Sequence, residues 1–142
     1  MYIDVWDSLP RSNYSEMVSS SKGKILISGS HHDTRFMMRV LLEMWGYEVA
    51  EAEGEEETVR MAESYLPNVI LVDTSRLFDE DIKVVSKLRV ANLPQLLPII
   101  VLSGFTQTKY QRAAIDHGAT NLLAKPLDLD RLESFLETAL PV

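Results

Sequence analysis

The feature that most constrains the fold is a set of short apolar runs with no polar alternation. They lie at residues 25–27, 69–72 and 99–102, and two less uniform segments lie at 47–50 and 121–124. Strands buried on both faces have this pattern, because helices cover both sides of a parallel sheet. The five segments therefore predict five strands of a parallel sheet.

Between these strands, apolar residues recur at helical spacing. One helix is expected to start near Glu55 and to be stopped by Pro67, with Gly46 and Gly118 as C-caps and Asp128 as an N-cap of other helices. Five helices alternating with five strands predict a three-layer α/β/α domain. The other four helix-spaced sets are Met37, Val40, Leu41 and Met44; Ile82, Val85 and Leu88; Tyr110, Ala113, Ala114 and His117; and Leu132, Phe135, Leu136 and Ala139.

The first 23 residues differ from the rest of the chain. They end in a Ser-Ser-Ser-Lys-Gly segment that is typical of a linker, and Tyr2, Ile3, Val5 and Trp6 precede it. We interpret residues 1–23 as an N-terminal arm and linker, either frayed or acting as a short apolar hook, and residues 24–142 as one domain.

Composition excludes several classes of function. The chain has no cysteine, which rules out disulfides and thiolate zinc sites. Its formal net charge is −7 at pH 7, and no cluster of Lys or Arg offers the basic face of a nucleic-acid binder. No apolar run approaches the roughly 18 residues of a membrane span. We therefore expect a cytoplasmic protein that binds neither nucleic acid nor membrane.

Polar side chains with chemical potential lie where the predicted strands end. Asp73 ends the third strand, Ser103 the fourth, and Lys125 follows the fifth, while Gly29 and Ser30 follow the first. In an open parallel sheet, functional groups gather at the carboxyl ends of the strands. A carboxylate, a hydroxyl and an ammonium group are thus expected at one edge.

The same segments resemble the receiver domain of bacterial two-component response regulators. The resemblance is carried by residues 24–27, Arg35, 46–49, 67–73, 98–103, 118–119 and 125–126, and it extends from about residue 24 to 139. It implies a flavodoxin-like sheet of order 2-1-3-4-5 and a regulatory domain, not an enzyme. It also implies a sensor histidine kinase or other signalling protein as the partner, and a possible homodimer through the last two helices and last strand.

The resemblance assigns a role to each residue at the strand ends. It implies that Asp73 is the phosphoacceptor, that Ser103 contacts a phosphoryl oxygen, and that Lys125 pairs with phosphate or aspartate. The family's Mg²⁺-binding acid pair is replaced by Gly29 and Ser30. We expect no cofactor, and Mg²⁺ only if the altered site still binds it, with Asp73 and the backbone carbonyl of Ser75 as weak candidate ligands.

Further departures favour an atypical receiver. The turn at 74–78 is Thr-Ser-Arg-Leu-Phe in place of the family's Met-Pro-Gly pattern, and Leu122 stands at the aromatic switch position. With the acid pair gone, Asp73 is the one local anion left for Lys125, which predicts a direct contact between them. Phosphorylation at Asp73 is expected to be weak or absent.

Three alternatives stay open. The fold could serve as a phosphorylation-independent docking module, in which Asp73 and Lys125 form a structural ion pair. The Ser-Gly-Ser loop at 28–30 could hold the phosphate of a flavin (FMN), as the corresponding loop of flavodoxins does. His31, His32 and Asp33 could bind a transition metal, although we favour solvated histidines with Asp33 as a helix cap.

Overall fold

The computed structural model describes residues 21–140. At its centre is a parallel sheet of five strands in the order β2-β1-β3-β4-β5. The strands are β1 (Lys24–Ser28), β2 (Glu48–Ala52), β3 (Val69–Asp73), β4 (Ile99–Ser103) and β5 (Asn121–Ala124). The predicted flavodoxin-like α/β/α fold and its strand order are confirmed.

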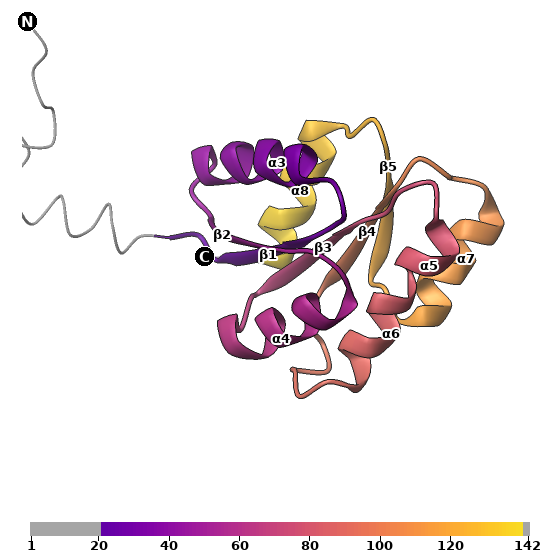
Figure 1. The fold of residues 1–142 in the computed structure, drawn as a ribbon. Helices are drawn as coiled ribbons and strands as arrows, with labels where there is room; N and C mark the ends of the chain where they lie inside the picture. Colours follow the sequence, from indigo (N-terminus) through magenta and orange to yellow (C-terminus); the bar gives the residue numbers. More distant parts are fainter. Residues whose placement is uncertain (1–20, 141–142) are drawn as a thin grey trace, which may run out of the picture.

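Helices cover both faces of the sheet (Figure 1). They are α3 (His32–Met44), α4 (Glu55–Tyr65), α5 (Phe78–Asp81), α6 (Lys83–Val90), α7 (Thr108–His117) and α8 (Leu129–Ala139). Helices α3 and α8 lie on one face, and α4 to α7 lie on the other. Each face has its own apolar cluster, so the sheet is the middle of three layers.

The central strands are buried because each successive side chain enters one of the two clusters. In β1, Leu26 belongs to the cluster under α4 and α6, while Ile25 and Ile27 belong to the cluster under α3 and α8. All three are fully buried. This two-sided burial explains why the strand has no polar alternation.

The segment after β3 contains one more helix than predicted. The single helix expected around Ile82, Val85 and Leu88 is two short helices, α5 and α6, joined at Ile82. The side chain of Asp81 accepts hydrogen bonds from both the backbone N–H and the hydroxyl of Ser75, at 2.7 Å each. These bonds connect the turn after β3 to the end of α5.

The apolar residues whose spacing predicted α3 are not the ones that the helix buries. Met37, Val40 and Met44 are exposed, and the helix buries Arg35, Met38 and Leu42 instead. The helix has apolar residues on more than one side, so periodicity alone does not determine which side meets the sheet. That choice depends on the rotational position at which the helix begins after the loop that follows β1.

Several predicted helix ends can be checked. Helix α4 starts at Glu55 and ends before Pro67, as predicted, whereas the C-cap of α3 is Trp45, and Gly46 follows it with a φ of 100°. Asp128 accepts a hydrogen bond from the backbone N–H of Arg131 at 3.2 Å, and Gly118 ends α7 with a φ of 111°, both as predicted. Asp33 is not the cap of α3. The N-cap position is His31, without a side-chain bond, and Asp33 lies in the first turn, where its charge still favours the helix dipole.

The predicted arm, residues 1–23, lies outside the described residues except for 21–23. The boundary between arm and domain therefore stays a prediction. Within residues 21–140, no helix combines the length and the apolar character that crossing a membrane requires.

Candidate functional site

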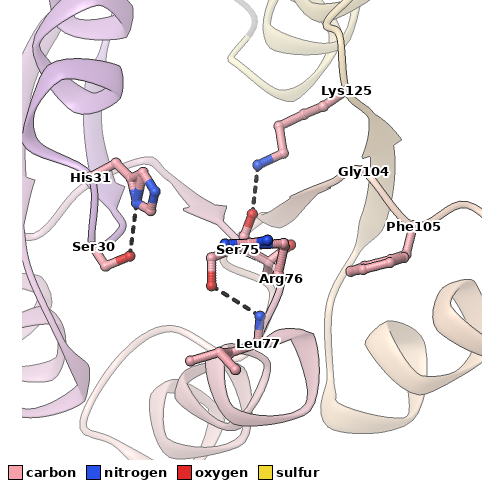
Figure 2. A pocket seen from close by; sticks show the side chains of 9 residues that line it. Ser30, His31, Ser75, Arg76, Leu77, Gly104, Phe105 and Lys125 are labelled. Atoms are coloured by element: carbon pink, nitrogen blue, oxygen red, sulfur yellow. Dashed lines mark hydrogen bonds between the residues drawn. The ribbon is translucent and has the colours of Figure 1, made fainter.

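An open cleft of about 710 Å³ lies at the carboxyl ends of four strands. Ser30 and His31 form one side, and Gly104, Phe105 and Lys125 form the other, with the turn after β3 between them (Figure 2). This is the position where open parallel sheets place their functional groups. The sequence predicted the edge and the loops that contribute to it.

Lys125 joins the loop after β5 to the end of β3. Its Nζ donates a hydrogen bond to Oδ1 of Asp73 at 2.7 Å and a second one to the carbonyl oxygen of Thr74. The Asp73 side chain is 9% exposed and that of Lys125 is 31% exposed. The predicted direct contact between Asp73 and Lys125 is confirmed.

Gly29 lies directly against Asp73. A Cβ atom added at Gly29 would be 3.2 Å from the Cβ of Asp73, which is tighter than most real contacts of this kind. Ser30 is exposed, and its hydroxyl bonds Nδ1 of His31 at 3.1 Å. The loop after β1 thus packs closely on Asp73 but brings no carboxylate to it.

These side chains do not fit Mg²⁺ in the way that receiver domains hold it. Mg²⁺ requires oxygen ligands in a nearly ideal octahedron, with carboxylates among them. One oxygen of Asp73 already accepts from Lys125, and Asp81 is held by Ser75. Within residues 21–140, no group of three His, Cys, Asp or Glu side chains is placed to hold a metal. The expectation that the chain does not bind Mg²⁺ measurably stays a prediction.

Ser103 is at the end of β4, as predicted, but its hydroxyl is engaged elsewhere. It donates to the carbonyl oxygen of Phe105 at 3.0 Å and accepts from the N–H of Phe105 at 2.9 Å. The residue is fully buried. The structure therefore brings Asp73 and Lys125 together, while Ser103 closes the turn after its own strand.

Aromatic side chains pack beside this turn. Phe105 stacks on Tyr110 with ring centroids 4.9 Å apart, and Phe78 and Tyr110 form a T-shaped pair with centroids 5.0 Å apart. Leu122, at the position where the family has its aromatic switch residue, is partly buried in the same apolar cluster. The wall of the cleft at β4 is therefore apolar and tightly packed.

Sequence reasoning missed the structural role of Arg35. This buried side chain donates to the carbonyl oxygen of Gly29 and, at 3.3 Å, to Glu51 on β2. Through these bonds it supports the loop after β1. Arg35 is part of the resemblance, but its pairing with Glu51 joins α3 to β2, and only the fold shows that these two elements lie side by side. Glu51 also accepts from Arg39, whose pKa is raised chiefly by a hydrogen bond to Glu43.

The loop at 28–30 is less available than the flavin alternative requires. The Ser28 hydroxyl is buried and shares a 2.7 Å hydrogen bond with Thr58. His31 and His32 are exposed, and the His32 ring stacks on Phe36 with centroids 6.5 Å apart. The histidines are solvated, as expected.

Comparison with known proteins identifies the family. A sequence profile of the response regulator receiver domain matches residues 25–137. The chain belongs to the response regulator receiver family. Members of this family are regulatory domains that work with histidine kinases and other signalling partners, and they typically use Mg²⁺ when they are phosphorylated.

Curated relatives of this receiver domain include transcription regulators. The transcriptional regulatory protein ZraR of Salmonella typhimurium is 29% identical over 104 residues, which cover 73% of this chain and 23% of ZraR. The transcription regulator BvgA of Bordetella pertussis is 29% identical over 103 residues, covering 72% of this chain and 48% of BvgA. The chain thus spans between about a quarter and a half of these proteins.

Solved receiver structures superpose well. Chemotaxis protein CheY4 of Vibrio cholerae gives a TM-score of 0.74 at 26% identity, covering 82% of this chain and 98% of CheY4. A response regulator of Chloroflexus aurantiacus gives 0.74 at 24% identity, covering 84% of this chain and 98% of that one. The second likeness supports the fold alone.

Proposed function

We propose that this receiver domain acts in a two-component phosphorelay, with Asp73 at the phosphoacceptor position and with weak or no Mg²⁺-dependent phosphorylation. The observation that carries the proposal is the contact between Asp73 and Lys125 beside a loop that offers no carboxylate. The proposal assigns the first 23 residues to an arm outside the receiver domain proper.

The chemistry of phosphoryl transfer explains the expected weakness. A carboxylate oxygen of Asp73 would attack phosphorus as the bond to the kinase histidine breaks, forming an acyl phosphate. Lys125 supplies one positive charge next to that oxygen. Carboxylate and phosphate are both negative, and Gly29 and Ser30 bring no acids that would recruit a cation to offset their repulsion.

The proposed partner is a sensor histidine kinase or another signalling protein. We further propose a homodimer through the face formed by α7, β5 and α8. Five charged residues of mixed sign on these helices are exposed: Lys109, Arg112, Asp116, Asp130 and Arg131. Complementary charges on a two-fold related face would set its register.

A docking module that works without phosphorylation is the second candidate. It is favoured by Ser103, because the hydroxyl that would contact a phosphoryl oxygen is bonded to Phe105 instead. In this case the Asp73–Lys125 pair would only stabilise the edge of the sheet, and partner binding would be insensitive to phosphodonors.

The test is incubation with a small phosphodonor, with and without Mg²⁺, followed by intact mass. We expect at most a minor phosphorylated species, with little dependence on Mg²⁺, and we expect Asp73→Asn to remove it. Strong Mg²⁺-dependent phosphorylation that is lost in Asp73→Asn would show a fully working receiver. No phosphorylated species under any condition would favour the docking module.

A further inference from the structure

The outer surface of α3 carries a stripe of large apolar side chains. Phe36, Met37, Val40 and Met44 are 54%, 71%, 42% and 78% exposed. At about 100° per residue, these four positions fall within one arc of the helix surface. The buried residues Arg35, Met38 and Leu42 lie on the other side of the helix, against the sheet.

This stripe differs from the other exposed apolar residues of the described chain. Those are single residues on separate segments, namely Leu66, Leu77, Val90, Leu96, Ile115 and Leu129. Isolated apolar residues on a surface need no partner, whereas a contiguous patch on a helix that is apolar on both sides indicates that something covers it.

The chain enters the domain at one end of this stripe. The backbone N–H of Lys22 donates to the carbonyl oxygen of Gly46 at 3.0 Å, and Gly46 comes two residues after Met44, the last residue of α3. Residues 1–20 precede the described part, so they are attached next to the exposed end of the helix.

The sequence of these residues is suited to the stripe. Tyr2, Val5, Trp6 and Leu9 recur at the i, i+3, i+4, i+7 spacing of one helical face, and Pro10 follows. The stretch between Pro10 and Lys22 can span up to about 40 Å when extended. The whole of α3 is about 20 Å long. The segment can therefore reach any part of the stripe.

We propose that the apolar segment around Tyr2 to Leu9 of this same chain packs on the α3 stripe. Phe36, Met37, Val40 and Met44 would be removed from water by Tyr2, Val5, Trp6 and Leu9.

The first experiment places a spin label on the segment. The chain has no cysteine, so Asp4→Cys gives one nitroxide site without removing an apolar residue. Broadening of backbone amide signals is then measured in the ¹⁵N-labelled full chain. We expect amides of α3 from Phe36 to Met44 to lose more than half of their intensity, and amides of α6 to lose almost none. Equal broadening of α3 and α6, or none in α3, would overturn the proposal.

Mixing distinguishes the chain's own segment from that of a second copy. Spin-labelled protein at natural nitrogen abundance is mixed with ¹⁵N-labelled protein that carries no nitroxide. We expect no broadening of α3 in this mixture at low concentration. Broadening as strong as in the single chain would assign the stripe to a second copy and overturn the intramolecular contact.

A second measurement uses Trp6 as the probe in a Trp45→Phe background. We expect Met37→Glu with Met44→Glu to raise acrylamide quenching of Trp6 severalfold and to shift its emission to the red. The matched control is Val90→Glu with Leu96→Glu, at positions 87% and 94% exposed on another part of the surface. The proposal fails if acrylamide quenches Trp6 as strongly as a fully exposed tryptophan before the α3 substitutions are made. It also fails if the control substitutions have the same effect as those on α3.

Discussion

The carboxyl edge of the sheet consists of two halves that offer very different chemistry to a phosphoryl group. Strands β3 and β5 bring Asp73 and Lys125 into contact at 2.7 Å. Strand β1 brings Gly29, which packs on Asp73 without a side chain, and Ser30, which bonds His31. One half carries a carboxylate paired with an ammonium group, while the other carries no carboxylate beside Asp73.

Each half is nevertheless fixed by a cation of its own. In the β1 half, Arg35 donates hydrogen bonds to the Gly29 carbonyl and to Glu51. In the other half, Lys125 donates hydrogen bonds to Asp73 and to the Thr74 carbonyl. The loop after β1 therefore has a structural support that does not depend on acids at Gly29 and Ser30.

The largest effect on the chemistry of the site is expected from restoring the acids, Gly29→Asp with Ser30→Asp. The new carboxylates would recruit Mg²⁺ beside Asp73, and the ion would offset the repulsion between carboxylate and phosphate. We expect Mg²⁺-dependent phosphorylation by a small phosphodonor to rise at least about tenfold, equal to about 1.4 kcal/mol in the barrier. Intact mass over time measures the rate.

Geometry at Gly29 supplies the control for that experiment. Any side chain there must displace Asp73 slightly, since the added Cβ lies 3.2 Å from that residue's Cβ. Gly29→Ala tests this steric cost without charge, and exposed Ser30→Asp tests charge without the steric cost. A double variant that binds Mg²⁺ tightly but never accepts phosphate would show that the site lacks more than the acid pair.

The second prediction concerns the support of the β1 half. Arg35→Met would leave the Gly29 carbonyl and part of the Glu51 carboxylate without their buried donor. We expect the free energy of unfolding to fall by about 2–3 kcal/mol, since Glu51 keeps Arg39 as a partner. Urea unfolding followed by circular dichroism measures it. The control is Arg39→Met on the same helix, which should cost less than about 1 kcal/mol because the Arg39–Glu43 pair is exposed. Equal losses in the two variants would contradict the role given to Arg35.

The sequence predicted the sheet better than the helices that cover it. Strands β1, β3 and β4 could be located because two-sided burial removes polar residues from 25–27, 69–72 and 99–102. The buried face of α3 could not be found, because both of its sides are apolar and the loop after Gly29 sets its rotation. The short α5 was missed because it depends on the bond between Asp81 and Ser75, which the spacing of apolar residues does not reveal.

The same limit applies to the site. Asp73, Ser103 and Lys125 were located at the edge because the ends of parallel strands meet there. Contact between Asp73 and Lys125 was expected from the resemblance and from the charge balance left by Gly29 and Ser30. The hydrogen-bond partner of Ser103 could not be predicted, because a hydroxyl can bond within its own turn or to a neighbouring strand, and the sequence does not distinguish the two arrangements.

The third prediction concerns the cation of the other half. Lys125→Met would leave the nearly buried Asp73 carboxylate without its ion pair. We expect a loss of about 1–2 kcal/mol in unfolding free energy, less than for Arg35, because the Lys125 side chain is about one-third exposed and solvent screens the pair. The control is Lys83→Met, whose pair with Glu80 is exposed and should contribute less than about 0.5 kcal/mol. A loss at Lys125 no larger than at Lys83 would show that the contact does not stabilise this half.

The smallest effect is expected at Ser103, and it tests whether the hydroxyl belongs to the chemistry or only to the turn. Ser103→Ala removes both hydrogen bonds to Phe105, so we expect the unfolding free energy to fall by about 1 kcal/mol, with Ser103→Thr restoring most of it. In the background with acids at positions 29 and 30, binding a phosphoryl oxygen would require the hydroxyl to give up its bond to the Phe105 carbonyl. That exchange of one bond for another has little net energy, so phosphorylation should slow by no more than about threefold, equal to about 0.6 kcal/mol in the barrier. A much larger slowing that Ser103→Thr reverses would place Ser103 with Asp73 and Lys125 in the reacting half, despite its position at rest.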